Sequence, residues 1–399
     1  MSASSAAGGI EPGAVAWAEV AAHLVALAQL PGIGPATLLR WHRGVGACEA
    51  WRVVQRGVAA EIVALAGPRS RLAESGVAPL VAAARSLDPH RELERQGADG
   101  RRVLVEGTPE FPERLRHDPA PPAVLFADGD PRVLAQPAVA VVGTRNATRA
   151  GRDLAAGWGA ELAAAGVAVV SGLALGIDAA AHRGALHAGS LAEPEAPAGA
   201  PVGVVAAGLD VAYPRRHAEL HREVARHGVL LSEVPLGIRP TSWRFPARNR
   251  IIAGLADAVV VVESRTVGGS ILTAGEGLER GIPVLAVPGH PSAPASAGTN
   301  DLLFDGAHLV RSSADVLAHL GLSAPAPSPG ERQQAPLDAA AEAVLAAIGT
   351  QPSALAEVVA RCELELEDVA RTLIALEAAG RVTRTAGWYE VVAPRGSGR

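Results

Sequence analysis

A short strand–turn–helix segment combines residue types that favour phosphate binding. The apolar run Val139–Val142 leads into Gly143-Thr144-Arg145, and the segment Thr148–Ala165 is predicted to be helical. A helix N-terminus that follows a strand presents free backbone N–H groups to an anion. The guanidinium of Arg145 adds a planar set of donors at the same place. The sequence therefore predicts a phosphate site centred on Arg145.

The same segment differs from the common nucleotide-binding motifs. It matches neither GxGxxG nor GxxxxGK[ST]. The second predicted strand, Val167–Val170, ends in Ser171 and Gly172, without an acidic residue that would hold a ribose. These differences favour a phosphate cradle with a fixed arginine over a dinucleotide site.

Two further arginine clusters follow predicted strands. Arg215 and Arg216 begin a predicted helix, where their charge opposes the helix dipole. A bound anion would compensate this charge; the alternative is that both are solvated surface side chains. In the stretch WRFPARNRII, from Trp243 to Ile252, two aromatic residues are interleaved with three arginines. Rings that stack on bases beside guanidinium groups are typical of a single-strand platform, whereas the alternative places both aromatic residues in the core.

A third helix start, Gly268-Gly269-Ser270, is again rich in N–H groups. The carboxyl ends of parallel strands meet at one edge of a sheet, so these turns together predict an extended groove for a polyanion. No catalytic set accompanies His182, His217 or His290, and no cofactor or metal site is expected. The carboxylates of Asp178 and Glu263 could form an acid–base pair, but the simpler expectation is that each orients an arginine.

The composition limits how nucleic acid could be bound. The chain has 399 residues, of which 49% are hydrophobic, and this predicts a globular protein of two or three domains. The net charge of −5 excludes binding by bulk charge, so any contact must come from a local arginine patch. Cys48 and Cys362 lie far apart and fit a reducing cytoplasm. No signal peptide and no membrane span are expected, since no run of about 18 apolar residues occurs.

Between residues 101 and 320 apolar strands alternate with helices, which predicts an α/β domain with a Rossmann-like, doubly wound parallel sheet. Nearly continuous valine runs indicate strands buried on both faces. The predicted strand cores are Val139–Val142, Val167–Val170, Val202–Val205, Val229–Leu231, Ala258–Val262 and Val284–Val287. The predicted helices are Thr148–Ala165, Gly176–His187, Pro214–Arg226, Asn249–Leu255 and Ser270–Arg280. The stretch Ala188–Pro201 is predicted to be a surface loop.

Smaller segments flank this domain. Residues 1–15 are expected to be disordered. Residues 16–96 form a predicted helical domain, whose segment LPGIGPATLLR is typical of a helix-hairpin-helix, either as a DNA contact or as a packing unit. Residues 323–336 are a predicted linker. Residues 337–392, with three short helices and a hairpin turning at Ala386-Gly387, predict a winged helix; its third helix has a single arginine, which favours protein contact over duplex binding.

The motifs between Phe111 and Val310 resemble those of one known family. In order along the chain they are GTRNATRAG, SGLALGID, GLDVAYPRRH, LLSEVPLG, FPARNRIIAGL, GGSILTA, VPG and GTNDLLFDGA. This series is similar to that of the DNA-processing protein A family, also called DprA or Smf. The helical N-terminal block and the winged helix follow the domain order of that family.

The resemblance implies a DNA-binding protein and not an enzyme. It implies that the protein binds single-stranded DNA in the Rossmann-like domain, dimerises through that domain, and protects incoming DNA while loading the RecA recombinase during natural transformation. Arg215 stands where lysine is common, Thr144 replaces the usual serine, and Gly268 stands where a serine is common. The residues expected to contact DNA are Gly143, Thr144, Arg145, Thr148, Ser171, Gly172, Arg215, Phe245, Arg248, Asn249, Arg250, Gly269, Ser270 and Thr273.

Two other functions are compatible with parts of the sequence. A phosphoribohydrolase on a Rossmann-like fold would cradle a nucleoside monophosphate with similar glycine turns, and would need Glu263 or Asp178 at the glycosidic bond. A transcription regulator would use the winged helix, but the net acidity and the arginine-poor third helix speak against it.

Overall fold

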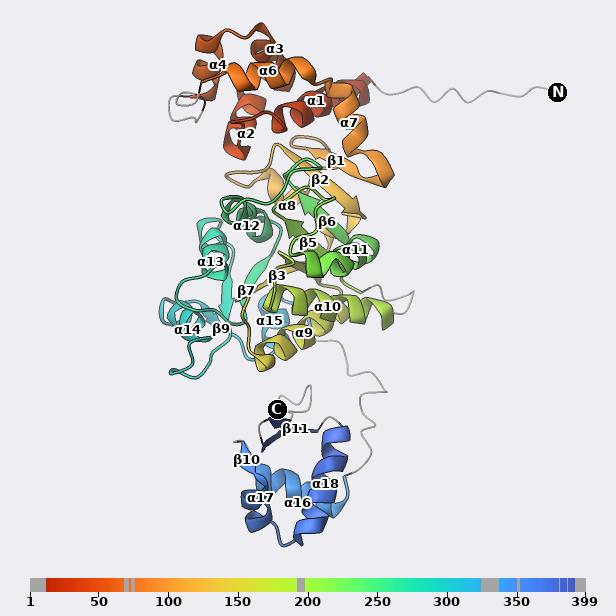
Figure 1. Cartoon of the computed structure of the whole chain (residues 1–399), viewed down its shortest axis with the longest axis vertical. Helices are drawn as coiled ribbons and strands as arrows, with labels where there is room; N and C mark the ends of the chain where they lie inside the picture. The colour runs from red at the N-terminus through yellow and green to blue at the C-terminus, as the bar shows by residue number, and fades with distance from the viewer. Residues whose placement is uncertain are drawn as a thin grey trace, which may run out of the picture. The chain divides into compact units, whose positions relative to one another are not determined.

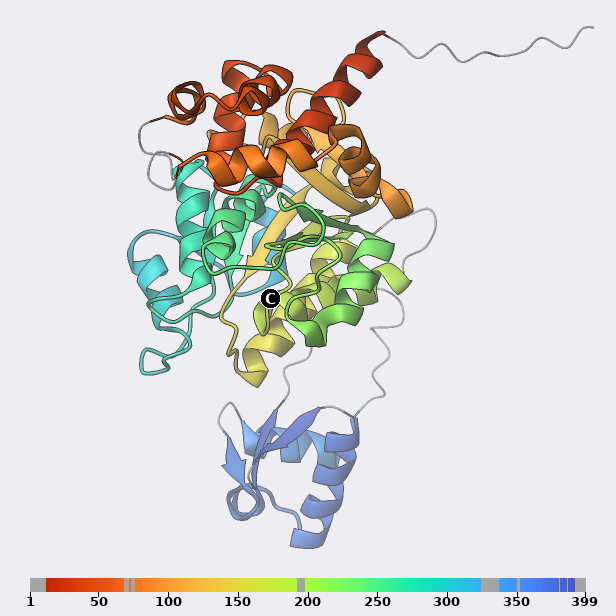
Figure 2. The same ribbon diagram turned by 45° about the horizontal axis from the view of Figure 1, so that its top comes forward.

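The computed structural model describes residues 12–67, 72, 76–191, 198–323, 337–349, 352–379, 381–385 and 387–391 (Figures 1 and 2). The chain forms two compact units, Met1–Ala324 and Pro325–Arg399. Of the predicted disordered tail and linker, residues 1–11 and 324–336 lie outside the described residues. Helix α1 (Pro12–Ala28) begins inside the predicted tail, so the helical region starts earlier than expected.

Nine described strands form one sheet in the first unit. They are β1 (Arg102–Val105), β2 (Val124–Gly129), β3 (Ala138–Val142), β4 (Ala168–Ser171), β5 (Pro201–Val205), β6 (Val229–Ser232), β7 (Ala258–Val261), β8 (Val284–Ala286) and β9 (His308–Leu309). Their order is β1-β2-β6-β5-β4-β3-β7-β8-β9. The sheet is parallel from β6 to β9, and β1 and β2 add an antiparallel edge.

The six predicted strands are confirmed as β3 to β8, and three strands were not predicted. Strands β1 and β2 pair only with each other and with β6, and β9 has two exposed residues whose strand conformation depends on β8. The order reverses at β3, because the chain runs outward through β4, β5 and β6 and then returns to β7. Ligands of such sheets bind in the crevice at this switch point.

Helices cover both faces of the sheet. Helices α9, α10 and α15 pack on one face, where Trp158, Leu162 and Leu317 join the core, and α12 and α13 pack on the other through residues such as Ile252 and Ala274. Helix α10 extends into the predicted loop Ala188–Pro201, of which residues 192–197 lie outside the described part. The elements are α8 (Glu113–Arg116), η2 (Pro131–Ala135), α9 (Arg149–Ala164), α10 (Ile177–Leu191), η3 (Arg215–His217), α11 (Ala218–His227), α12 (Arg244–Gly254), α13 (Gly269–Glu279), α14 (Ala297–Phe304) and α15 (Ser313–His319).

The N-terminal helices pack directly on the sheet. Buried residues of this block, such as Trp41 and Leu24, share one apolar cluster with Val124 and Phe126 of β2. A tight turn joins α1 to α2, as the helix-hairpin-helix pattern predicted; at Gly32 φ is +84°, and a Cβ would lie 2.6 Å from the Leu72 side chain. The elements after α1 are α2 (Pro35–Gly44), α3 (Ala47–Arg56), α4 (Ala59–Ala66), α6 (Ala78–Ser86), α7 (Pro89–Gln96) and η1 (Ala98–Gly100).

The second unit is a winged helix, as predicted. Its elements are α16 (Ala339–Ile348), β10 (Ser353–Ala354), α17 (Leu355–Arg361), α18 (Leu366–Ala378), β11 (Val382–Thr385) and β12 (Trp388–Val391). The second helix of this unit, which the sequence predicts over Ser353–Cys362, begins only at Leu355, because Ser353 pairs with Tyr389 as part of a third strand. The predicted turn residue Ala386 lies outside the described residues. In α18, Arg371 forms ion pairs with Glu367 and Asp368, so its charge is neutralised within the helix.

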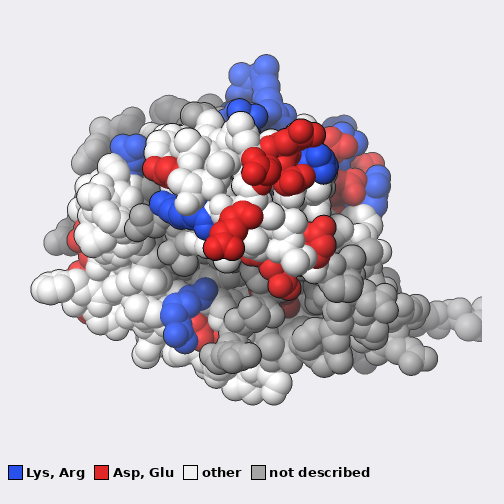
Figure 3. Space-filling view, turned by 90° about the horizontal axis from the view of Figure 1, so that it is seen from below, with Lys and Arg blue, Asp and Glu red and all other residues white. Residues whose placement is uncertain are grey.

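The surface carries charges of both signs. On the face shown in Figure 3, acidic and basic side chains are interspersed, in keeping with the small net charge of −5. Within the described residues, no helix combines the length and apolar character that crossing a bilayer requires.

Two histidines are buried between the sheet and α10 or α11. His182 is fully buried, and its Nε2 lies 3.2 Å from the carbonyl oxygen of Val202. His221 is 5% exposed. Burial lowers the pKa of both imidazoles from 6.5 to about 4. Each imidazole is therefore neutral in the folded protein at a pH where it is charged in the unfolded chain.

This burial predicts a protein that loses stability in mild acid. The unfolded chain binds more protons than the folded protein between pH 6.5 and about 4, so stability is complete above pH 6.5 and falls below it. From pH 7 to pH 5 we expect the free energy of unfolding to fall by about 2 kcal/mol for each histidine. Urea unfolding at both pH values measures this change. His182→Gln should reduce it, whereas His117→Gln, at an exposed site, should not; equal pH dependence in the two variants would contradict the assignment.

Candidate nucleic-acid site

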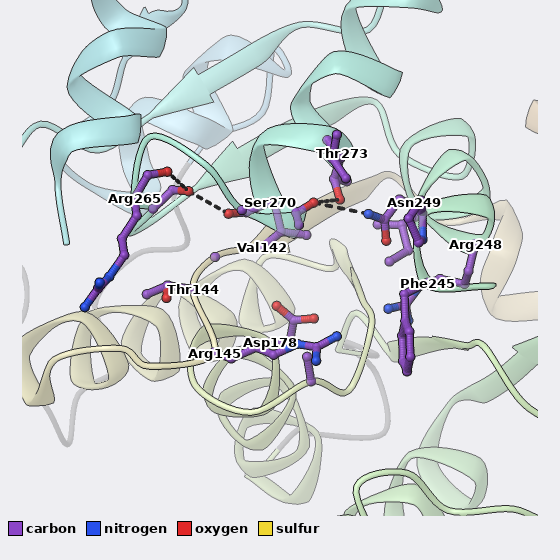
Figure 4. Close-up of a pocket in the computed structure, with 18 of the residues that line it drawn as sticks. Val142, Thr144, Arg145, Asp178, Phe245, Arg248, Asn249, Arg265, Ser270 and Thr273 are labelled. Carbon is purple, nitrogen blue, oxygen red and sulfur yellow. Dashed lines mark hydrogen bonds between the residues drawn. The ribbon is translucent and has the colours of Figure 1, made fainter. Parts of the chain in front are cut away.

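A cleft of about 320 Å³ opens at the switch point of the sheet (Figure 4). One wall is the turn after β3, and the other walls are α12 and the loop that leads from β7 into α13. The backbone N–H of Thr144 donates to the carbonyl oxygen of Glu263 over 2.7 Å, which joins the ends of β3 and β7. Three arginines and one carboxylate line the cleft: Arg145, Arg248, Arg265 and Asp178. The cleft therefore has an excess of positive charge in a protein that is acidic as a whole.

Arg145 lines the cleft, and its guanidinium is free. The side chain is exposed, and it forms no hydrogen bond or ion pair with any residue that the structure describes. Its guanidinium carbon lies 5.0 Å from the ring centre of Phe245, and the ring of Tyr213 lies 5.4 Å from that of Phe245. An unpaired cation over one ring, which itself contacts a second ring, can bind a phosphate beside a surface on which a base stacks.

The buried side chain of Arg248 fixes the position of α12, which forms one wall of the cleft. Only 7% of the residue is exposed, and the guanidinium donates to the carbonyl oxygens of Gly172, at 2.9 Å, and of Val204. Burial lowers the pKa of Arg248 to about 10, while the nearby carboxylate of Asp178 acts in the opposite direction. Burial likewise raises the pKa of Asp178, which accepts a hydrogen bond from the Gly172 N–H at 3.2 Å. Arg248 thus positions α12 against the sheet, and Asp178 offsets its charge.

Helix α13 brings an uncapped N-terminus to the cleft. Gly268 precedes the helix and no side chain caps it, so its first N–H groups remain available to an anion. The backbone oxygen of Gly269 accepts from Asn249 and Thr273 at 3.1 Å each, and the hydroxyls of Ser264 and Ser270 lie 2.8 Å apart. These bonds hold the helix start in place, but they also engage the polar ends of three residues that the sequence assigned to DNA.

Helix α9 differs from the prediction, because its N-terminus is already occupied. The carboxylate of Glu263 accepts from the Thr148 hydroxyl at 2.5 Å and from the Thr148 N–H at 2.9 Å, and the Thr148 hydroxyl accepts from Gly151. A Cβ on Gly151 would lie 2.3 Å from the Glu263 carboxyl carbon. The predicted phosphate site at the start of α9 is therefore filled by an internal carboxylate, and the open helix N-terminus belongs to α13.

The structure brings most of the predicted residues to the cleft. Those that line it are Gly143, Thr144, Arg145, Phe245, Arg248, Asn249, Gly269, Ser270 and Thr273. The others lie outside it, each for a physical reason. Ser171 is fully buried and donates to Val141, and the backbone of Gly172 is bonded to Arg248 and Asp178. Thr148 caps α9, and Arg250 donates to Glu233 at 2.6 Å.

The remaining predicted residue, Arg215, is exposed in η3 and does not line the cleft. Residues that the sequence analysis did not assign to DNA also reach the cleft, among them Arg265, Val267 and Leu272. Val267 and Leu272 are 89% and 52% exposed, which no sequence pattern indicated. Tyr213, just before the predicted helix Pro214–Arg226, was not assigned to DNA either, and its contact with Phe245 depends on the fold. Among the described residues no group of three or more His, Cys, Asp or Glu side chains could hold a metal ion.

Comparison with known proteins identifies the family. Residues 102–321 match the family described as DNA recombination-mediator protein A. The chain belongs to this family. Residues 324–387 match the DprA winged helix domain, so both units carry the same assignment. The resemblance seen in the motifs is confirmed.

Relatives from several bacteria cover most of the chain. A protein Smf from Synechocystis is 30% identical over 92% of this chain and 97% of its own length. A putative DNA processing protein DprA from Mycobacterium tuberculosis is 38% identical over 84% of this chain and 82% of its own. The X-ray structure of DNA processing protein A from Streptococcus pneumoniae is 28% identical, has a TM-score of 0.61, and covers 75% of this chain and 97% of its own.

The capping role of Glu263 can be measured as stability. In Glu263→Gln the amide has a single acceptor oxygen and no charge, so one bond to Thr148 and the interaction with the helix dipole are lost. We expect the free energy of unfolding to fall by about 1–2 kcal/mol in urea denaturation. Glu279→Gln, at an exposed position of α13, is the control and should change little. Equal stability of the two variants would show that Glu263 does not cap α9.

Proposed function

We propose that the cleft binds single-stranded DNA, with Arg145 on a phosphate and Phe245 under a base. The observation that carries this proposal is the free Arg145 guanidinium, held 5.0 Å from the Phe245 ring centre and not neutralised by any described carboxylate. A buried carboxylate would have cancelled the charge, whereas an arginine kept unpaired beside a ring is available to a ligand that is both anionic and aromatic.

The same geometry favours a single strand over a duplex. Stacking on Phe245 and Tyr213 requires a base whose faces are exposed, and in a duplex both faces are covered by neighbouring base pairs. The net charge of −5 gives the protein as a whole little general attraction for duplex DNA. Affinity must therefore come from the cleft, where an unstacked strand can reach the rings and the arginines together.

We further propose that the bound strand is protected and handed to the RecA recombinase during transformation or recombination. Membership of the recombination-mediator family supports this role. A mediator has to hold the backbone while leaving part of the strand accessible, and an open cleft at a sheet edge is compatible with that requirement. We place this activity in the cytoplasm, where the recombinase acts and where the free cysteines Cys48 and Cys362 stay reduced.

An enzymatic role on nucleotides receives less support from the site. Glycosidic bond cleavage needs a carboxylate that faces the substrate, but both oxygens of Glu263 accept hydrogen bonds from Thr148. Asp178 is 6% exposed and is committed to the Gly172 N–H beside Arg248. Release of free base from nucleoside monophosphates by the purified protein, lost in Glu263→Gln, would establish the enzymatic alternative instead.

Replacement of Arg145 tests the proposed contact with the strand. In Arg145→Ala the charge-assisted contact with phosphate is lost, and single-strand binding should weaken by about 1.5–3 kcal/mol. Fluorescence anisotropy with a labelled single strand across a salt series measures this loss, and the slope against salt should also decrease. RecA assembly on strands coated with single-strand binding protein should then lose its acceleration.

Arg132→Ala is the matched control, because Arg132 is 88% exposed and paired with Asp130 away from the cleft. It removes the same charge and should leave binding unchanged. If Arg145→Ala binds as tightly as Arg132→Ala, the strand does not lie in this cleft. If Arg145→Ala loses DNA binding but wild-type protein never accelerates RecA assembly, the cleft binds DNA and the mediator role is wrong.

We also propose a homodimer formed through the Rossmann-like domain. At one end of the sheet β9 is an edge strand, with Leu309 53% exposed, and the neighbouring α14 ends at Phe304, which is 93% exposed. An unpaired strand edge beside an exposed phenyl ring is a surface that a second copy of the chain can cover. The isologous contact of a two-fold dimer would bury both rings at once.

A single charged substitution tests this dimer. Phe304→Glu places a carboxylate in the contact, so we expect the dimer dissociation constant to rise at least about tenfold. Light scattering after size exclusion, over a concentration series, measures the molar mass. Val45→Glu is the control, since Val45 is 45% exposed just after α2, in the helical block that shares its core with β1 and β2 at the other end of the sheet from β9. An unchanged dimer in Phe304→Glu, or a monomer in the wild type, would contradict the proposal.

A further inference from the structure

A second cavity lies next to the cleft, on the other side of α12, and its mostly apolar lining includes three charged residues, Glu233, Arg244 and Arg248. It has a volume of about 40 Å³, enough for about three water-sized groups or the oxygens of a phosphate. Its lining joins two parts of the chain that are far apart in sequence: Gly34 and Pro35 from the hairpin turn, and Trp243, Arg244 and Arg248 from the start of α12. Figures 1 and 2 both show α2 beside α12.

We propose that this cavity and the hairpin turn bind a phosphate of the same DNA strand, just outside the cleft. The inference rests on the proposed function of the cleft and extends it. The ligand is a phosphodiester of single-stranded DNA, and Trp243 provides a second surface on which a base can stack. The strand would thus cross the first turn of α12 between two aromatic positions, Phe245 and Trp243.

The hairpin turn has donors with no protein partner. Gly34 precedes α2 in an extended conformation, with φ of −101° and ψ of 171°, and no side chain caps the helix. The backbone N–H groups of Gly34, Ala36 and Thr37 donate to no acceptor among the described residues, while Leu38 donates to Gly34. These groups form the open N-terminus of a ten-residue helix, and such groups favour an anion.

Two arginines add an independent reason for an anion at this place. Arg248 is 7% exposed and Arg244 is half-buried, and the Nε atom of each is buried without a partner among the described residues. The one carboxylate that lines the cavity belongs to Glu233, which already accepts from Arg250 at 2.6 Å. With two arginines and one carboxylate, the lining of the cavity has an excess of positive charge, which a phosphate would neutralise.

Helix α12 connects the two sites. Arg248 lines both of them, Phe245 and Asn249 lie on the cleft side, and Trp243 and Arg244 lie on the cavity side. The guanidinium carbon of Arg244 lies 4.7 Å from the ring centre of Trp243, which is 39% exposed. This arginine–aromatic pair repeats the arrangement of Arg145 and Phe245 on the other side of the same helix turn.

Gly34→Asp tests the proposal without harming the fold. Aspartate is a favoured residue at a helix N-cap, so its carboxylate would satisfy the free N–H groups of α2 and at the same time repel a phosphate. Gly34→Ala is the matched control. Its Cβ meets no atom within 4 Å and its φ is negative, so it adds bulk without charge.

The readout is the dependence of affinity on strand length. With an oligothymidine of about 6 nucleotides, which the cleft can hold alone, all three proteins should bind equally; with about 20 nucleotides, Gly34→Asp should bind about tenfold more weakly than wild type and Gly34→Ala. Thermal unfolding should show that Gly34→Asp is at least as stable as the wild type. Trp243→Ala should weaken the long strand alone, whereas Trp17→Ala, with a similar exposure of 38%, should weaken neither.

The outcomes separate this inference from the function of the cleft. If the short strand binds and depends on Arg145, but Gly34→Asp binds the long strand like Gly34→Ala, the second contact is wrong and the cleft stands. If neither strand binds to the wild type, the function of the cleft is wrong. If Gly34→Asp weakens a duplex of matched length and not the single strand, the hairpin turn is a duplex contact, and the proposed path over α12 is overturned.

Discussion

The buried guanidinium of Arg248 is the interaction on which the rest of the site depends. It ties α12 to the backbone just beyond β4 and to β5 by donating to the carbonyl oxygens of Gly172 and Val204. Since α12 carries Phe245 and Trp243, the position of both rings follows from these bonds. Burying a guanidinium costs free energy, which is visible in its lowered pKa, and the carbonyl oxygens and the nearby Asp178 offset this cost. A close contact at Gly172 enforces the arrangement, because a Cβ there would lie 2.5 Å from the Arg248 guanidinium.

Around this anchor the structure divides its arginines into two groups. Arg248 and Arg250 are buried and bonded to carbonyl oxygens or to Glu233, and they hold the backbone in place. Arg145 and Arg265 line the cleft and are exposed. All four residues are arginines, so residue type cannot distinguish the two groups. Burial alone distinguishes them. This division explains how an acidic protein without lysine can still offer an anion a concentrated positive site.

The helix N-termini divide in a similar way. Glu263 and Thr148 cap α9, so its dipole is satisfied inside the protein. Helices α13 and α2 begin after Gly268 and Gly34 and have no side-chain cap, so their first N–H groups remain open. Glycine at these positions provides no side-chain acceptor that would compete with a ligand. The two open termini flank α12. N–H donors for a DNA backbone therefore lie on both sides of Phe245 and Trp243.

Much of this molecule follows from the sequence by itself. The valine runs determined β3 to β8, because strands buried on both faces require apolar residues at every position. The helices between these strands determined that the strands run parallel. The glycine and arginine turns identified the edge where the cleft lies, since parallel strands end on one side. The edge strands β1, β2 and β9 escaped prediction because their pairing depends on distant partners. Only the tertiary structure decided which predicted residues face the ligand: Glu263 reaches α9 from 115 residues away, and Ser171 and Arg250 turn inward. Residue type sets what a side chain can bind, but burial and long-range contacts decide whether its donors are already taken.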